Sequence, residues 1–462
     1  MPGKSERPFL LDATALLKWG PNVPTGLPRV EASLVAETIR APGPTPALFA
    51  FDPGLRRCRL LTAEERLFVE KCVAVFNASG PGGPVAKGFA ARLREVISLY
   101  RLDLFCAGRE IHRSIAQYLI GADGREGATY KIVKTLVRGA FAMTRLWRWA
   151  LRRDNTAAPD PLADPANSCL ISINTCSALY RHYPEAAVRC RLMLLVYDTT
   201  PLDYPDLAAE GHAERFARYF RFGISTASDV VSISAATMAS VRAWATRLGI
   251  DTAGKRFHAV ALASSLSDDR VRSEPVPEFA DRTYVLYCAT LEPRKNHAVL
   301  LKAWSELIAQ SGRAEMPLLV LVGRWGWRIE ATRRMLADDP RLAGTVRVLS
   351  FVPDRQLKWL YEHALFTVFP SIAEGWGLGA TESLDLGTPV LIADIAALHE
   401  ATQGLMPAIA PADTAGWHDR IAELIREPAL CLGLRKTIAT GYRRRSFTDV
   451  FGEVMSIAAM DL

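Results

Sequence analysis

The sequence lacks several features that mark common classes of protein. None of its eight cysteines forms a C-x-x-C pair, and none lies in a metal-ligand spacing with histidine. We therefore expect the cysteines to be small buried hydrophobic residues in a reducing compartment. No apolar run approaches the roughly 18 residues needed to span a membrane, and no hydrophobic leader follows Met1, which predicts a cytoplasmic protein.

The chain also lacks a large excess of charge of one sign. The 462 residues carry a net charge of +7, which favours anionic partners but does not choose between nucleotides, nucleic acid and lipid head groups. A hydrophobic content of 49% can fill more than one core. A chain of this length is expected to form two domains of about 200 residues each.

Apolar strands alternate regularly with amphipathic helices in the second half of the chain. The predicted strands of this half are residues 284–288, 317–323, 345–351, 364–370 and 389–394. This alternation predicts a parallel sheet with helices on both faces, a doubly wound α/β domain. The expected domain covers residues 271–445.

The first half has a less regular pattern of the same kind. Its predicted strands are residues 8–14, 47–52, 103–108, 170–174, 191–198 and 229–234. A polar, proline-containing segment at 264–282 predicts a linker. We therefore expect an N-terminal Rossmann-like domain over 1–270, facing the second domain across a cleft, and a C-terminal helix at 446–462 that packs back on the N-terminal domain.

Acidic residues are absent from one stretch of the first half. Residues 130–153 contain seven basic residues interleaved with leucines, phenylalanine and two tryptophans. A basic helix with tryptophans on its apolar side is typical of an interfacial anchor on an anionic membrane, and this interpretation is favoured. An ordinary surface helix packed on the core is the alternative.

A glycine-rich turn lies between the predicted strand 364–370 and the helix that follows it. It contains Gly375, Gly377 and Gly379, flanked by Glu374 and Glu382 in an E-x7-E pattern. Strand-to-helix turns of α/β folds bind nucleotides, because bare backbone N–H groups favour an anion there. The glutamates cannot favour an anion, so they are expected to contact the hydroxyls of a sugar or a ribose.

The same turn also matches a dinucleotide-binding fingerprint. Gly375, Gly377 and Ala380 follow the G-x-G-x-x-G/A pattern, and Asp394 ends the next strand. A dehydrogenase is therefore an alternative. The late position of the turn in its sheet, and Glu374 directly before it, argue against a pyrophosphate site.

Two adjacent cations follow the first strand of the second domain. Arg294 and Lys295 lie in LEPRKNH, at a strand-to-helix junction. Permanent cations beside helix N–H groups suit a diphosphate. Their position in the same domain as the glutamates favours a functional role over a solvated charge pair.

Together these motifs resemble the retaining family-4 (group 1) glycosyltransferases of GT-B fold. The similarity extends through LVGRWGW, FVPDRQLKWLYEHA, FPSIAEGWGLGATESLDLGTPVLIAD and LHEATQG, and covers nearly the whole second domain. The first half is similar to the polysaccharide-assembly branch, which includes mannosyltransferases, through residues 10–34, LLVYDTTPLDYPD and SDVVSISAAT.

The resemblance implies a role for each site residue. Lys295 and Arg294 would neutralise the leaving diphosphate, Glu374 would contact the donor sugar, and Glu382 would hold the ribose. Asp198 would close on the donor from the N-terminal domain. The resemblance places further donor contacts at Gly26, Gly375, Trp376, Gly377 and Leu378, and places Phe351 and Val352 at the base.

The chain departs from the family at three positions. Tyr197 stands where relatives usually have histidine near the donor sugar, although a tyrosine can still hydrogen-bond a sugar hydroxyl. Ala289 replaces a common arginine, which leaves the phosphates to the Arg294–Lys295 pair. Gly379 stands where proline is commoner. The absence of an Asp-x-Asp pair implies an enzyme without a metal or other cofactor.

These features predict a retaining, metal-independent hexosyltransferase of cell-surface polysaccharide biosynthesis. Its donor would be a nucleotide-diphosphate sugar, with mannose implied by the resemblance, and its acceptor a growing lipid-linked oligosaccharide at the inner face of a bacterial membrane. Nucleic acid is not expected as a partner. A sugar-nucleotide epimerase of the same fold and a non-catalytic scaffold, favoured by Tyr197, remain alternatives.

Overall fold

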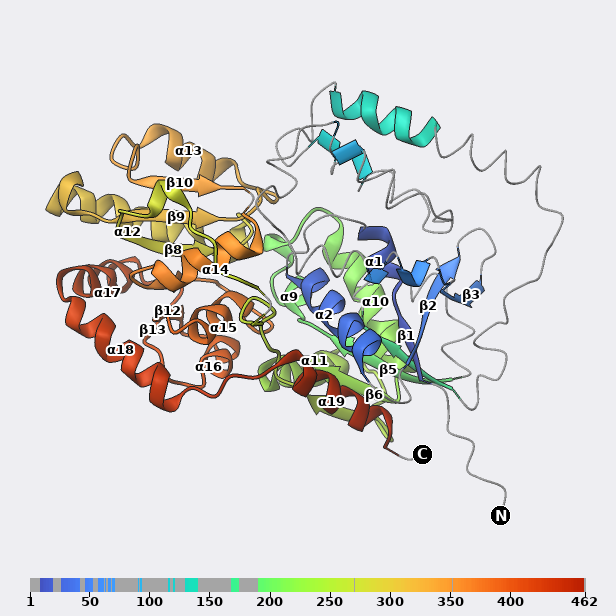
Figure 1. Cartoon of the computed structure of the whole chain (residues 1–462). Coiled ribbons are helices and arrows are strands. Elements are labelled where there is room, and N and C mark those ends of the chain that lie inside the picture. The colour runs from blue at the N-terminus through green and yellow to red at the C-terminus, as the bar shows by residue number, and fades with distance from the viewer. Residues whose placement is uncertain are drawn as a thin grey trace, which may run out of the picture.

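The computed structural model contains two α/β domains that lie side by side (Figure 1). It describes residues 9–19, 26–41, 46–52, 57–61, 63, 65–67, 69–70, 90, 92–93, 115–116, 119–120, 129–139, 168–173, 190–269, 271–350 and 352–460. No helix in these ranges combines the length and the apolar character needed to cross a bilayer.

The N-terminal domain is built on a seven-stranded sheet with the order β3-β2-β1-β4-β5-β6-β7. Its strands are β1 Phe9–Asp12, β2 Ala47–Asp52, β3 Arg57–Leu60, β4 Cys169–Ser172, β5 Arg191–Val196, β6 Asp229–Ser232 and β7 Arg256–Ala259. All neighbours are parallel except β2 and β3. Five of the six predicted strands are present, and the sixth, at 103–108, lies outside the described residues.

Successive side chains of a strand point to opposite sides of this sheet, and a buried core lies on each side. Leu11, Ile171 and Leu195 belong to the core on one face. Their chain neighbours Leu10, Leu170 and Leu194 belong to the core on the other face. The helices of this domain include α1 Thr14–Trp19, α2 Leu27–Arg40, α9 Thr200–Asp203, α10 His212–Thr226 and α11 Ala235–Arg247.

The C-terminal domain has a six-stranded, wholly parallel sheet with the order β10-β9-β8-β11-β12-β13. Its strands are β8 Tyr284–Cys288, β9 Leu318–Val322, β10 Val346–Leu349, β11 Thr367–Phe369, β12 Val390–Ala393 and β13 Ala408–Ile409. The helices are α12 His297–Ser311, α13 Glu330–Asp338, α14 Asp354–His363, α15 Leu378–Asp385, α16 Ala396–Ala401, α17 Thr414–Arg426 and α18 Pro428–Gly441. Each predicted strand of this half is present.

The chain crosses between the domains twice. In the first crossing, the polar segment 264–282 is anchored by Leu266, Val271 and Phe279, which are buried against the C-terminal sheet. In the second crossing, the chain leaves α18 and forms α19 Phe447–Ala458, drawn in red beside the N-terminal domain (Figure 1).

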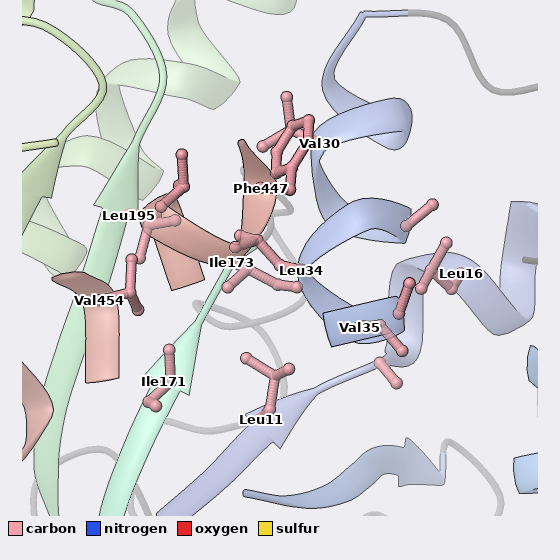
Figure 2. Close-up of a cluster of buried hydrophobic side chains, with 14 of the residues drawn as sticks. Leu11, Leu16, Val30, Leu34, Val35, Ile171, Ile173, Leu195, Phe447 and Val454 are labelled. Carbon is pink, nitrogen blue, oxygen red and sulfur yellow. The ribbon is translucent and has the colours of Figure 1, made fainter. Parts of the chain in front are cut away.

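Helix α19 completes the core of the N-terminal domain. Phe447 and Val454 pack with Leu34 of α2 and with Leu195 of β5 (Figure 2). The helix begins with a capping box between Ser446 and Asp449. At its other end, the Arg191 guanidinium donates to the carbonyls of Ile457 and Ala458, at 3.0 and 2.8 Å, so these helix-end acceptors are satisfied.

Truncation of Phe447 tests the contribution of α19. Because the side chain is only 8% exposed, Phe447→Ala should destabilise the N-terminal domain by about 3 kcal/mol. Leu432→Ala, on the exposed surface of α18, is the matched control and should change stability by no more than about 0.5 kcal/mol. Urea unfolding followed by circular dichroism measures both, and equal midpoints for the two variants would contradict the packing role of α19.

Candidate active site

A cavity of about 510 Å³ lies between the two domains. It is bounded by the segments that follow parallel strands of both sheets, where ligands of α/β folds bind. Phe351 lies outside the described residues. The other predicted site residues all line the cavity: Gly26, Asp198, Arg294, Lys295, Val352, Glu374, Gly375, Trp376, Gly377, Leu378 and Glu382.

The centre of the C-terminal wall is a carboxylate shared by two cations. Arg294 Nη1 lies 2.9 Å from Glu374 Oε2, and Lys295 Nζ contacts Glu374 Oε1. Burial alone would raise the pKa of Glu374, but the neighbouring Lys295 and Arg294 lower it to about 2. Glu374 is therefore ionised at neutral pH. The motifs that the sequence placed eighty residues apart form one ionic cluster.

A fourth charge completes this cluster. Glu292, which is 6% exposed, lies 2.8 Å from the Arg294 guanidinium. Burial raises the pKa of Glu292, and the two cations oppose that effect. Burial also lowers the pKa of Lys295, with Arg294 adding to the shift. Two cations and two carboxylates thus balance within the cluster.

Backbone contacts hold the two loops of the cluster together. The turn Pro293–Lys295 ends at Asn296, whose φ of 56° is left-handed and whose amide donates to the carbonyls of Pro370 and Pro411, at 3.0 and 2.7 Å. The N–H of Ile372 donates to the carbonyl of Arg294 at 2.9 Å. Since β8 and β11 are adjacent in the sheet, the loops that follow them are expected to meet.

The N-terminal wall touches the glycine turn directly. A Cβ added to Gly375 would lie 1.9 Å from the carbonyl oxygen of Tyr197, so only glycine permits this approach. The hydroxyls of Ser234 and Thr237 donate to the Gly375 carbonyl, at 2.7 and 3.0 Å. Burial raises the pKa of Asp198, which faces Arg294 and Lys295 across the cavity.

Tyr197 does not offer its hydroxyl to the cavity. The buried phenol donates to the carbonyl of Ile173 at 2.6 Å. In this structure the hydroxyl is thus engaged by the backbone of the N-terminal domain. The backbone of Tyr197, pressed against Gly375, is the part that shapes the cavity wall.

Glu382 lies on the first turns of α15, 6% exposed. The Tyr361 hydroxyl donates to its carboxylate at 2.9 Å. Burial raises the pKa of Glu382 to about 7, against the lowering effect of Arg29 and Tyr361. Gly379, one turn earlier, is fixed by packing, because a Cβ there would lie 2.1 Å from the Phe369 ring.

The dinucleotide alternative needs Asp394 at the ribose. Asp394 does not line the cavity, and its exposed carboxylate lies 2.7 Å from His399. The carboxylate that lines the cavity after the glycine turn is Glu382 instead. The geometry therefore disfavours a dehydrogenase site.

Several contacts across the domain interface were not predicted. Glu400 of α16 accepts from the N–H groups of Ala235 and Ala236, at 2.7 and 2.6 Å, and thus caps α11 of the other domain. The Trp327 indole donates to the carbonyl of Leu207 at 2.9 Å. Arg29 pairs with Asp354. No local sequence signal marks these contacts, since each joins residues more than 100 positions apart.

Comparison with known proteins gives matches for this arrangement. Residues 269–439 match the family described as glycosyl transferases group 1. The chain is 37% identical over 123 residues to O-antigen chain mannosyltransferase B of Escherichia coli, covering 27% of this chain and 32% of that protein. It is 26% identical over 265 residues to the serotype-specific mannosyltransferase WbdA of E. coli, covering 53% of this chain and 32% of that one.

The chain thus spans about a third of the length of these two relatives. Among solved structures, it is similar to a UDP-forming trehalose-phosphate synthase from Burkholderia xenovorans, with a TM-score of 0.51 and 12% identity. That likeness covers 72% of this chain and 80% of the other, and concerns the fold alone. On these matches, the C-terminal domain is a group 1 glycosyl transferase domain, and the chain has the GT-B fold.

Proposed function

We propose that the protein transfers a hexose from a nucleoside diphosphate to a growing, lipid-linked oligosaccharide, with retention of anomeric configuration. The observation that carries this proposal is the Glu374 carboxylate shared by Arg294 and Lys295, facing Asp198 in a cavity between two domains. Such a site offers cations to phosphates and carboxylates to hydroxyls. Mannose is the proposed sugar, because the curated relatives are named as mannosyltransferases.

The proposed reaction assigns one task to each part of the cavity. Arg294 and Lys295 stabilise the charge that develops on the leaving diphosphate, without a metal ion. Glu374 accepts hydrogen bonds from sugar hydroxyls, and Glu382 accepts them from the ribose. Leu378 begins α15 at the cavity wall, so the first N–H groups of that helix are available to an anion.

Transfer with retention requires the acceptor to attack from the face that the diphosphate leaves. The bond from the anomeric carbon to the phosphate oxygen breaks, and a bond from that carbon to the acceptor oxygen forms. The departing phosphate oxygen takes the acceptor proton. Contact between Tyr197 and Gly375 supports this proposal, because a cavity bounded by both domains excludes the water that would otherwise hydrolyse the donor.

We also propose peripheral contact with the inner face of an anionic membrane. Of the predicted anchor 130–153, residues 140–153 lie outside the described residues. Residues 129–139 are helical, with Val133 and Val137 packed on the core as a surface helix requires. Ile132 and Leu136 are nevertheless 59% and 66% exposed, and Lys131 and Arg138 are exposed beside them. Exposed apolar residues among cations favour a membrane surface.

The catalytic assignment is tested by Lys295→Ala and Glu374→Gln. Each should lower transfer from nucleotide sugars by about 100-fold or more, because the leaving charge loses a partner or the sugar loses an acceptor. Transfer is measured with purified protein, a panel of nucleotide sugars and a lipid-linked oligosaccharide acceptor. Arg347→Ala, whose exposed ion pair with Glu278 does not line the cavity, is the control and should retain full activity.

Full turnover by either site variant would contradict the assignment. Epimerised nucleotide sugar without transfer would favour the epimerase. Nucleotide binding without any reaction of the wild type would favour the non-catalytic scaffold.

Membrane contact is tested by reversing Lys131, Lys134 and Arg138 to glutamate. Because each cation near an anionic surface contributes about 1 kcal/mol, the triple variant should bind anionic vesicles at least about 100-fold more weakly. Co-sedimentation with phosphatidylglycerol vesicles measures the change. Charge reversal of Arg426, Lys436 and Arg443 in the C-terminal domain is the matched control, and equal binding by both triple variants would reject this helix as the contact.

A further inference from the structure

Arg29 is a buried cation that the proposed chemistry does not use. It lies on α2 of the N-terminal domain and is 8% exposed. Its two terminal nitrogens donate to the two oxygens of Asp354, at 3.1 and 2.8 Å. Asp354 begins α14 of the C-terminal domain and is 7% exposed. This bidentate pair therefore fixes the guanidinium in one orientation across the domain interface.

The pair lies beside the proposed ribose site. Arg29 and Glu382 both line the cavity between the domains. Asp354 follows Val352, which lines the same cavity, and α14 also carries Tyr361, the hydrogen-bond donor to Glu382. The first residue of α14 thus holds Arg29, and its last turn holds Glu382.

Arg29 has a distinct position among the charges that face Glu382. Burial is the main influence on the pKa of Glu382, and it raises it. Arg29 and Tyr361 lower this pKa, whereas Asp354 and Asp385 raise it, and the Cys288 thiol lies near the same carboxylate. Among these neighbours Arg29 is the cation, and it comes from the opposite domain.

We propose that Arg29 is a positioning residue for the nucleotide, which orients the Glu382 carboxylate toward the ribose hydroxyls while Asp354 holds the guanidinium in place. This inference rests on the proposed nucleotide-sugar donor. It makes ribose recognition depend on both domains, because Glu382 reaches its full strength as an acceptor only when α2 lies against α14. Nucleotide binding and closure of the domains would then support each other.

The two partners of the pair have opposite effects on Glu382. Loss of Arg29 removes a cation, so Glu382 would take up a proton at higher pH and lose its acceptor role there. Loss of the Asp354 charge removes an anion and frees Arg29 for Glu382, so protonation would need a lower pH. If the pair only held the two domains together, the loss of either partner would change nucleotide binding in the same way.

The test measures dissociation constants of GDP, UDP and ADP by calorimetry between about pH 6 and about pH 9. Arg29→Gln should shift the loss of affinity for the preferred ribonucleotide to higher pH, with about fivefold weaker binding at about pH 7 and about tenfold weaker binding at about pH 6 for a shift of one unit. Asp354→Asn should shift the loss to lower pH. Arg29→Lys, which keeps the charge, should restore most of the wild-type pH profile.

The 2′,3′-dideoxy form of the same diphosphate is the matched control. It carries the same titrating phosphates but no ribose hydroxyls, so neither variant should shift its pH profile. Equal weakening of nucleotide binding by Arg29→Gln and Asp354→Asn, without opposite shifts of the pH profile, would overturn the inference. The pair would then be a contact that only holds the domains together. Absence of binding of any nucleoside diphosphate to the wild type would instead contradict the proposed function.

Discussion

The shared carboxylate of Glu374 is the interaction around which the cavity is organised. It holds two cations that burial would otherwise make costly, and the cations in turn keep it ionised. Buried ion pairs often add little net stability, because desolvation offsets their attraction. In the proposed function, this ion-pair cluster serves to position the cations. It holds Arg294 and Lys295 where a diphosphate can replace Glu374 as their partner. In the proposed reaction, the arrival of the phosphates would release Glu374 to the sugar.

The domain interface converges on the same turn. Gly375 admits the backbone of Tyr197, its carbonyl accepts from Ser234 and Thr237, and Glu400 caps the helix that carries Thr237. Gly375 therefore joins the C-terminal wall of the cavity to the N-terminal domain. The substitution of tyrosine for histidine at 197 affects this joint less than the sequence suggests, since the phenol points away to Ile173 and only the backbone takes part.

The sequence predicted the local features of the fold and the site but not the contacts between distant segments. Strands β8, β9 and β12 of the C-terminal domain could be recognised because both faces are buried and their residues are continuously apolar. Strands β3 and β7 were missed because their sequences, RCRL and RFHA, are short and half of their residues are basic or histidine. The motifs around Arg294 and Glu374 identified the cavity. Arg29 and Glu400 carry no local signal, since their partners lie 325 and 165 positions away.

The return of α19 has a consequence for how the chain is made. The sheet face formed by Leu11, Ile171 and Leu195 is covered in part by Phe447 and Val454, which leave the ribosome only after the whole C-terminal domain (Figure 2). The C-terminal domain, built from one continuous stretch, can complete its core earlier. Of the two domains, the one that is translated first is thus the one that finishes folding last, and until then it depends on protection of an apolar surface.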